Sequence, residues 1–120
     1  MTIKTANVSM AEKVALIDQL CAQARILPVI TIARKQDILP LADALAAGGL
    51  TALEVTLRSE FGLEAIRVLR DQRPELVTGA GTVLDRHMLA AAEEAGSQFI
   101  VTPGITRDLL EASVASDIPL

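Results

Sequence analysis

LEVTLR, at residues 53–58, is the stretch of sequence that decides the fold. Its odd-numbered residues are apolar, while Glu54, Thr56 and Arg58 at the even-numbered positions are polar or charged. Strict alternation over six residues is typical of a β-strand, because successive side chains of a strand point to opposite faces. The sequence therefore predicts a strand over residues 51–57 with one apolar face and one polar face.

Short apolar runs rich in β-branched residues also occur before and after this strand. The predicted strands cover residues 27–33, 51–57, 76–82 and 98–102, so that their starts lie 24, 25 and 22 residues apart. Helical stretches separate them, and this alternation is typical of βα units around a parallel sheet. The sequence therefore predicts a single domain of the α/β class. Its helices are expected to have N-caps at Asp37, Ser59, Asp85 and Thr106.

The two ends of the chain carry further helices. Ser9 and Glu12 have the spacing of a capping box, which predicts a leading helix over residues 9–25. Cys21 falls on the apolar face of this helix, and we expect it to be a small core residue. The last predicted helix, about 107–116, runs into residues 118–120, which resemble the opening of a fifth strand. The chain is therefore expected to be truncated at that point.

Composition limits the classes of function. The chain has 120 residues, 51% of them hydrophobic, and its 11 positive and 15 negative charges sum to −4. Such a chain can bury one core without disulfides or a structural metal. With only Phe61 and Phe99 as aromatics and an acidic balance, nucleic acid is not an expected partner. The longest run without a charge, 95–106, has 12 residues, too few to span a membrane.

Cysteine and histidine each occur once. Because Cys21 and His87 are the only residues of these types, no His/Cys metal cluster, Ser-His-Asp triad or Cys-His pair is expected. We therefore expect no metal and no cofactor, and we expect His87 to lie at the surface. A lone thiol beside an ordinary core indicates a reducing compartment, so a cytoplasmic location is expected.

Glu54 is the residue best suited to acid–base chemistry. Both faces of a parallel sheet are normally covered, so a carboxylate in mid-strand is expected to lose water and to have a raised pKa. Such a group can move protons near neutral pH. The alternative is a buried pair of Glu54 with Arg58 that only fixes the strand. These residues lie about 13 Å apart along an ideal strand at roughly 3.3 Å per residue, so contact requires the arginine to fold back.

Two other strand ends carry glycine-rich or polar motifs. GAGT at residues 79–82 closes the third predicted strand, where glycines let a ligand or a neighbouring backbone come close. TPGIT at residues 102–106 closes the fourth and leads into a capped helix whose N–H groups could face an anion. GAGT is weak alone, since it has neither dinucleotide nor P-loop spacing, and a close-packed strand is its favoured interpretation.

The motifs together resemble the 2-keto-3-deoxy-6-phosphogluconate (KDPG) and 4-hydroxy-2-oxoglutarate (KHG) aldolase family. They occur in order along nearly the whole chain: PVI (28–30), AGG (47–49), EVTLR (54–58), GAGTVL (79–84), TPGIT (102–106) and IPL (118–120). The resemblance implies a (β/α)8 TIM barrel preceded by a helix, a fold that takes about 250 residues. Residues 27–120 would then form the first four βα units, that is, half of the barrel.

The resemblance also implies a class I aldolase that uses a lysine imine (Schiff base) as its electron sink. Such enzymes cleave KDPG, a sugar acid of the Entner–Doudoroff pathway, to pyruvate and glyceraldehyde 3-phosphate, or cleave KHG to pyruvate and glyoxylate. Glu54 matches the family's proton-transfer residue, and Pro103 matches a residue that lines the pocket. Arg58 and Thr82 match the residues that hold the carboxylate of pyruvate. A homotrimer is implied as well.

The imine-forming lysine of the family lies on the sixth strand, outside this sequence. Lys4, Lys13 and Lys35 are the lysines present, and none falls at an inward strand position. The chain alone is therefore expected to be inactive. The alternative is a non-catalytic half barrel or a small α/β binding module that self-associates, because half a barrel leaves its first and fourth strands unpaired.

Overall fold

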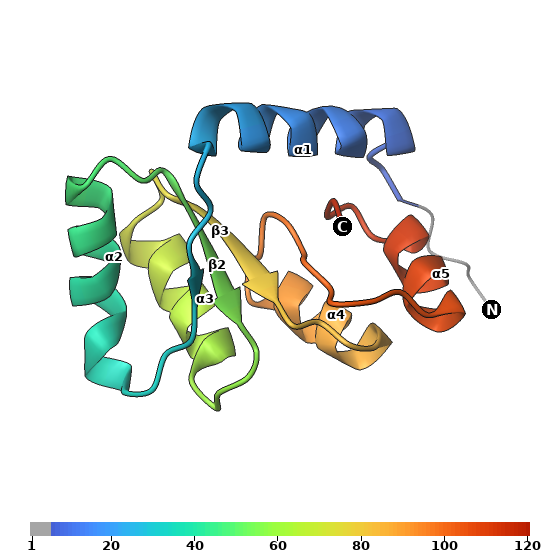
Figure 1. Ribbon diagram of the computed structural model, residues 1–120. Helices are drawn as coiled ribbons and strands as arrows, with labels where there is room; N and C mark the ends of the chain where they lie inside the picture. The colour runs from blue at the N-terminus through green and yellow to red at the C-terminus, as the bar shows by residue number, and fades with distance from the viewer. Residues whose placement is uncertain (1–5) are drawn as a thin grey trace.

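A parallel β-sheet with helices along one face forms the body of the molecule (Figure 1). The computed structural model describes residues 6–120. The elements in chain order are α1 (Met10–Ala24), β1 (Val29–Ile30), η1 (Lys35–Asp37), α2 (Ile38–Ala47), β2 (Ala52–Thr56), α3 (Gly62–Gln72), β3 (Val77–Gly81), α4 (Arg86–Glu94) and α5 (Arg107–Ala115). The strands pair in the order β1-β2-β3, all parallel, which confirms the predicted α/β class.

The outer strands are shorter than the sequence predicts. The strand predicted over 27–33 is reduced to β1, although pairing continues backward, since Glu54 N donates to Pro28 O at 2.9 Å. Pro28 has no N–H of its own to continue the ladder. The strand predicted over 98–102 is only an isolated bridge between Ile100 and Ala80. Its backbone still runs along β3, because Val101 N donates to Ala80 O at 2.8 Å.

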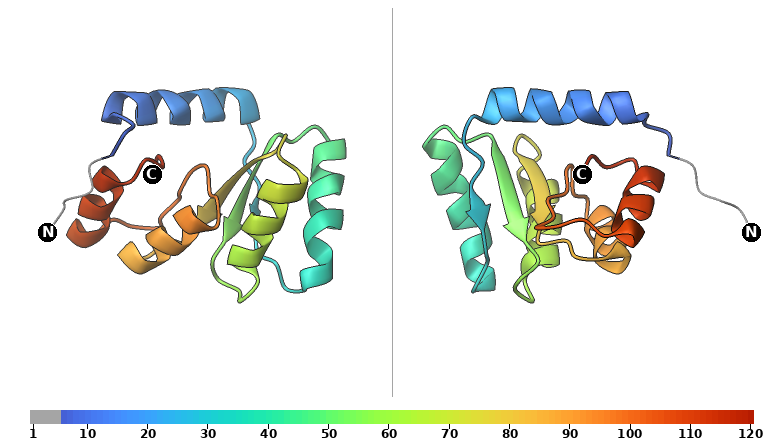
Figure 2. Two further views of the ribbon diagram at one scale, coloured as in Figure 1. Left: turned by 180° about the vertical axis from the view of Figure 1, so that it is seen from behind. Right: turned by 45° about the vertical axis from the view of Figure 1, so that its right-hand side comes forward.

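The hydrophobic core lies between the sheet and its helices (Figure 2). Leu53 and Val55 of β2 point to this side and are fully buried, together with Ile66 and Leu69 of α3. The alternation predicted for β2 is therefore confirmed, since its apolar positions face the helices. The even-numbered side chains of β2 lie on the opposite face, which α2 and α3 do not cover.

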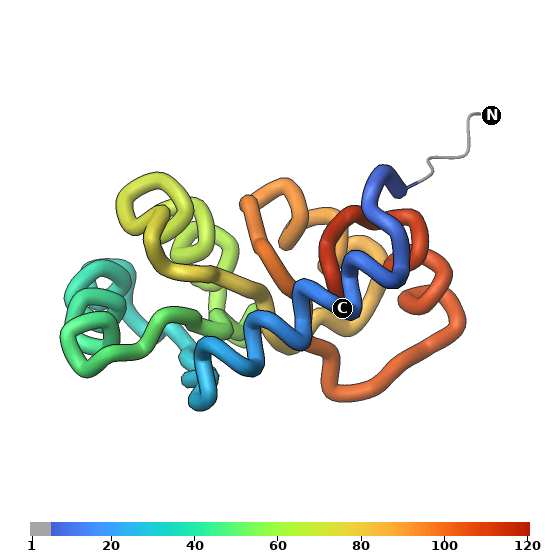
Figure 3. The backbone as a smooth tube through the Cα atoms, turned by 90° about the horizontal axis from the view of Figure 1, so that it is seen from above, coloured from blue at the N-terminus to red at the C-terminus, as the bar shows by residue number. Residues whose placement is uncertain are grey.

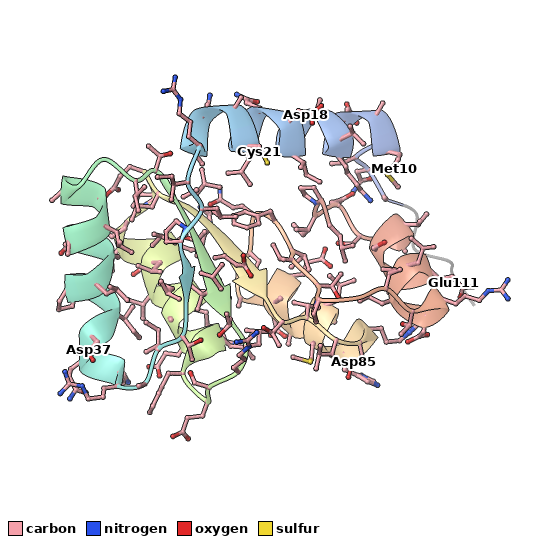
Figure 4. All side chains as sticks on the ribbon, in the orientation of Figure 1. Met10, Asp18, Cys21, Asp37, Asp85 and Glu111 are labelled. Carbon is pink, nitrogen blue, oxygen red and sulfur yellow. The ribbon has the colours of Figure 1, made fainter. Side chains whose placement is uncertain are left out.

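Helix α1 crosses the end of the sheet where the strands begin and reaches α5 (Figures 1 and 3). Its predicted capping box is confirmed: Glu12 N donates to Ser9 Oγ at 3.2 Å, and Ser9 N donates to Glu12 Oε2 at 2.7 Å. The expectation that Cys21 is a core residue is wrong, because this thiol is exposed on α1 (Figure 4). The reason is that α1 spans the sheet's end and does not lie flat on a face, so much of its apolar side stays uncovered.

A buried lysine and an aspartate attach α1 to the end of the chain. Lys13 is 4% exposed, and its Nζ donates to Ser113 O at 3.0 Å, in the last turn of α5. Just before α1, Val8 N donates to Asp117 Oδ1 at 3.0 Å. These contacts join residues about a hundred positions apart, and they fix the direction in which α1 crosses the sheet.

Two of the four predicted helix caps are confirmed. Met88 N donates to the Asp85 side chain at 2.8 Å, and Leu109 N donates to Thr106 Oγ1 at 3.1 Å. Asp37 precedes α2 as predicted, but its carboxylate binds the Arg34 guanidinium and caps no helix N–H. The cap predicted at Ser59 is wrong, because α3 begins only after Phe61. None of the described helices is long and apolar enough to cross a membrane.

Candidate functional site

Glu54 is held in the middle of β2, on the face away from the helices. Its side chain is 6% exposed, and its backbone pairs in register with Gly79 of β3. The central position of β2 in the sheet explains this burial, because strands flank it on both sides. The sequence thus places a carboxylate where few groups can replace its lost water.

Two glycines of β3 make room for bulky groups on this face. A Cβ at Gly81 would overlap the Glu54 carboxylate and would lie 2.8 Å from its Cδ atom. A Cβ at Gly79 would lie 2.5 Å from ring atoms of Phe99. The glycines of the GAGT motif are therefore packing requirements, which confirms the close-packed strand that the sequence favours. At Gly81, the missing side chain leaves the room that the Glu54 carboxylate occupies.

Burial raises the pKa of Glu54 above the ordinary value for a glutamate, and the charge of Arg58 offsets part of this rise. No hydrogen bond or ion pair to the Glu54 carboxylate occurs among residues 6–120. The structure therefore contains no direct ion pair between Glu54 and Arg58, the alternative that the sequence offered. Instead, the carboxyl group has the desolvated environment that general acid–base chemistry requires.

Arg58 and Thr82 meet where β2 and β3 end. Arg58 Nε donates to Thr82 Oγ1 at 3.2 Å. Both strands run in the same direction, so residues that follow them emerge at the same edge of the sheet. The pair is accessible to solvent, and a guanidinium beside a hydroxyl can receive a carboxylate through several hydrogen bonds.

Thr82 also has a strained backbone. Its φ is +59°, in the left-handed region that a β-branched residue rarely adopts. Backbone strain of this kind costs of order 1–3 kcal/mol and is concentrated at functional sites. In this chain it turns the backbone sharply just after β3, at the residue whose hydroxyl accepts from Arg58.

Pro103 lies in the exposed turn after residues 98–101. Because that segment runs parallel to β3, the turn leaves the sheet at the edge where Thr82 lies. Gly104 N donates to Thr102 Oγ1 at 3.3 Å, which closes the turn. That Pro103 lines a pocket with the other residues stays a prediction.

Thr31 is a residue of this face that sequence reasoning did not single out. It follows β1 directly, and its Oγ1 lies 2.6 Å from Oγ1 of Thr56, which is 1% exposed. Polar alternation in β2 marked Thr56 as sharing a face with Glu54. No local pattern marks Thr31, because its neighbour is 25 residues away and only strand pairing brings the two hydroxyls together.

The described lysines are engaged elsewhere. Lys13 Nζ donates to the end of α5, and Lys35 Nζ lies 2.6 Å from Glu64 Oε1 of α3 at the surface. Lys4 lies outside the described residues. His87 is exposed, as expected, and no cluster of three His, Cys, Asp or Glu residues within 6–120 could hold a metal ion. The described residues thus offer proton transfer and carboxylate binding, but no free amine beside Glu54.

A cavity of about 570 Å³ lies at the other end of the sheet. It is bounded by Leu16 and Leu20 of α1, by Val77 at the start of β3, and by Phe99. Glu54, Arg58 and Thr82 do not line it. This cavity and the candidate chemical groups are therefore separate features.

Comparison with known sequences gives one family. Its sequence model, described as KDPG and KHG aldolase, matches residues 17–120. The chain is 62% identical over 112 residues to 2-dehydro-3-deoxy-phosphogluconate aldolase of Pseudomonas aeruginosa, covering 93% of this chain and 51% of the relative. It is 46% identical over 95 residues to KHG/KDPG aldolase of Escherichia coli K12, covering 79% of this chain and 45% of that protein.

Solved structures agree with these sequence matches. KDPG aldolase from Legionella pneumophila, with pyruvate captured as a covalent carbinolamine intermediate, superposes with a TM-score of 0.82 at 42% identity, over 84% of this chain and 49% of that one. The KDPG aldolase of Zymomonas mobilis ZM4 with 3-phosphoglycerate superposes with a TM-score of 0.79 at 46% identity. The match covers 85% of this chain and 49% of that one. The chain thus spans about half the length of the relatives it matches.

Proposed function

Because this chain belongs to the KDPG and KHG aldolase family, we propose that it supplies the acid–base and carboxylate-binding half of a class I aldolase. The reaction is reversible cleavage of KDPG to pyruvate and glyceraldehyde 3-phosphate. The observation that carries the proposal is Glu54, a desolvated carboxyl group of raised pKa that feels the charge of Arg58, whose guanidinium binds Thr82 where β2 and β3 end. The Legionella relative, whose pyruvate was captured as a carbinolamine, supports the chemistry.

Each group has one task in this reaction. Amine attack on the keto acid, loss of water from the carbinolamine and protonation of the enamine each move a proton, and Glu54 serves these steps. The guanidinium of Arg58 and the hydroxyl of Thr82 hold the carboxylate of pyruvate. Pro103 lines the same pocket from the adjacent turn. Substrate carboxylate and reacting carbon are thereby placed along one face of β2.

The electron sink is a lysine that lies outside residues 1–120. The described lysines have other partners, so the half alone is inactive in this proposal. The complete enzyme is a (β/α)8 barrel that assembles as a homotrimer in the cytoplasm. Cleavage of KHG to pyruvate and glyoxylate is a second reaction of the same site, supported by the name of the Escherichia coli relative.

Borohydride trapping tests this proposal directly. The complete aldolase, incubated with pyruvate and borohydride, is expected to gain the mass of one reduced pyruvate adduct, located by peptide mapping on a lysine beyond residue 120. The chain of residues 1–120 is expected to stay unmodified. Glu54→Gln should slow trapping and turnover by about 10²- to 10⁴-fold, the usual contribution of a general acid–base. An adduct on Lys13 or Lys35, or none in the complete protein, would contradict the proposal.

A self-associating half barrel is the second candidate. Val29 on the open face of the sheet is 60% exposed, and Val14 and Leu16 of α1 are 50% and 47% exposed. Apolar side chains exposed beside an unpaired strand edge favour contact with another chain. In this case the chain binds a copy of itself and carries no catalytic activity.

A further inference from the structure

The hydroxyls of Thr31 and Thr56 form a short polar contact between β1 and β2. Their Oγ1 atoms are 2.6 Å apart, a typical distance for an O–H···O hydrogen bond. Thr56 is 1% exposed, whereas Thr31 is exposed to solvent. One member of the pair is thus fixed within the sheet, and the other is open to a ligand.

The pair lies between the two groups that the proposed function uses. Glu54 and Thr56 are alternate residues of β2, so their side chains leave the same face. Arg58 lies in the turn two residues after Thr56, where β2 has ended. Thr56 is about 6.6 Å from Glu54 along a strand that rises roughly 3.3 Å per residue, and the charge of Arg58 acts on Glu54 from the turn beyond Thr56. A keto acid whose carboxylate is bound at Arg58 and whose reacting carbon is near Glu54 therefore lies close to the threonine pair, because Thr56 stands between the two residues at the end of β2.

One hydroxyl hydrogen of the Thr31–Thr56 pair is not used in the hydrogen bond between the two residues. Two hydroxyls carry two hydrogens, and a single hydrogen bond between them uses only one. Either hydroxyl can be the donor at this distance. Donation from Thr56 to Thr31 is the arrangement that leaves no unpaired hydrogen on the buried hydroxyl, because no other hydrogen bond of Thr56 Oγ1 occurs among the described residues. The hydrogen of Thr31 then points away from Thr56, and a hydroxyl that already accepts a bond is a better donor.

We propose that Thr31 donates a hydrogen bond to an oxygen of the bound keto acid, and that Thr56 is the positioning residue that directs this hydroxyl. The inference rests on the proposed function, because it assumes a keto acid between Arg58 and Glu54. It adds a third strand, β1, to the substrate site. The competing role is purely structural, in which the two hydroxyls only tie β1 to β2.

Steady-state kinetics of the complete aldolase with KDPG distinguishes these roles. Thr31→Val is expected to lower kcat/KM about 3- to 10-fold, the loss of one neutral hydrogen bond, with most of the change in KM. Thr31→Ser keeps the hydroxyl and is expected to stay within about twofold of the wild type. Thr31 is exposed, so these variants are expected to fold. The control is Thr51→Val, an exposed threonine at the opposite end of β2.

A double-mutant cycle tests the positioning role of Thr56. Thr56→Val should reproduce the KM increase of Thr31→Val, and the double variant should be no worse than either single variant, because both remove the same directed donor. Equal KM values for Thr31→Val and wild type, with only a lowered melting temperature, would overturn the inference while leaving the aldolase proposal standing. A wild-type enzyme that neither cleaves KDPG nor traps pyruvate would overturn both.

Discussion

At the scale of single residues, the site depends on the fit of a carboxyl group against a glycine. Glu54 is buried on β2, and the absence of a side chain at Gly81 gives its carboxylate room. Burial raises the pKa of Glu54, so the folded state holds this proton more tightly than the unfolded state does. The same fit therefore sets both the shape of the site and its protonation.

The raised pKa of Glu54 predicts a pH-dependent stability difference. The folded state holds the proton of Glu54 more tightly than the unfolded state does. The protonated side chain therefore stabilises the fold fully at pH values below the pKa that Glu54 has in the unfolded chain, and this stabilisation is lost as the pH rises through the pKa of Glu54 in the folded protein. Glu54→Gln cannot ionise. The melting temperature of this variant relative to wild type is expected to increase from about pH 4 to pH 8. A difference that is constant with pH in thermal denaturation would contradict the raised pKa.

Gly81→Ala is expected to destabilise the fold by about 1–3 kcal/mol, because the added Cβ overlaps the Glu54 carboxylate and a packed sheet resists such insertion. Gly104→Ala is the matched control. No atom lies within 4 Å of a Cβ at Gly104, so its change should be within about 0.5 kcal/mol. Urea denaturation of the two variants measures both values. Equal stabilities would show that the space beside Glu54 is not tight.

At the scale of elements, α1 is fastened at its N-terminal end. The capping box fixes where the helix begins, and Lys13 fixes where it points. The ammonium group of Lys13 is buried against the last carbonyl groups of α5. A positive charge at this position also interacts favourably with the negative end of the helix dipole. Lys13 is the only buried residue of α1, so its contact with α5 is a main attachment of this helix.

Lys13→Ala is therefore expected to release α1 from α5. A hydrogen bond from a charged donor contributes about 1.5–3 kcal/mol, and its loss should speed hydrogen exchange in α1 more than in α3. Lys35→Ala is the control, since the Lys35–Glu64 pair is at the surface and contributes about 0–1 kcal/mol. Unchanged exchange in α1 of the Lys13 variant, measured by mass spectrometry, would refute this role.

At the scale of the whole molecule, α2 and α3 cover one face of the sheet and not the other, although Glu54 and Thr56 on that second face are themselves buried. β1 pairs only with β2 among the described strands, and the chain spans about half the length of its relatives. A complete barrel closes such edges with further strands. In the proposed aldolase, further strands of the barrel pack against the edge of β1; in the second candidate, another copy of this chain does.

Residues 1–120 expressed alone are expected to self-associate. Multi-angle light scattering after size-exclusion chromatography should give a mass above the 12.7 kDa of one chain, increasing with concentration. The complete aldolase should instead run as a trimer whose mass does not change with concentration. A monomer of residues 1–120 at every concentration would contradict the half-barrel interpretation and favour a small, self-sufficient module.

Local patterns in the sequence determined much of this protein. Alternation in residues 53–58 predicted both the faces of β2 and the buried Glu54, and the caps at Asp85 and Thr106 were read from single residues. These predictions succeed because strand alternation and helix capping depend on residues within a few positions of one another. The family resemblance, confirmed over residues 17–120, rested on the same short motifs.

Only the tertiary structure decided which distant residues meet. The hydroxyl pair of Thr31 and Thr56, the fit of Glu54 beside Gly81, and the contact of Lys13 with α5 join positions 25, 27 and 100 residues apart. The exposure of Cys21 followed from the direction of α1, which distant contacts fix. Periodicity tells which face of an element is apolar, but strand register and helix packing decide what that face touches.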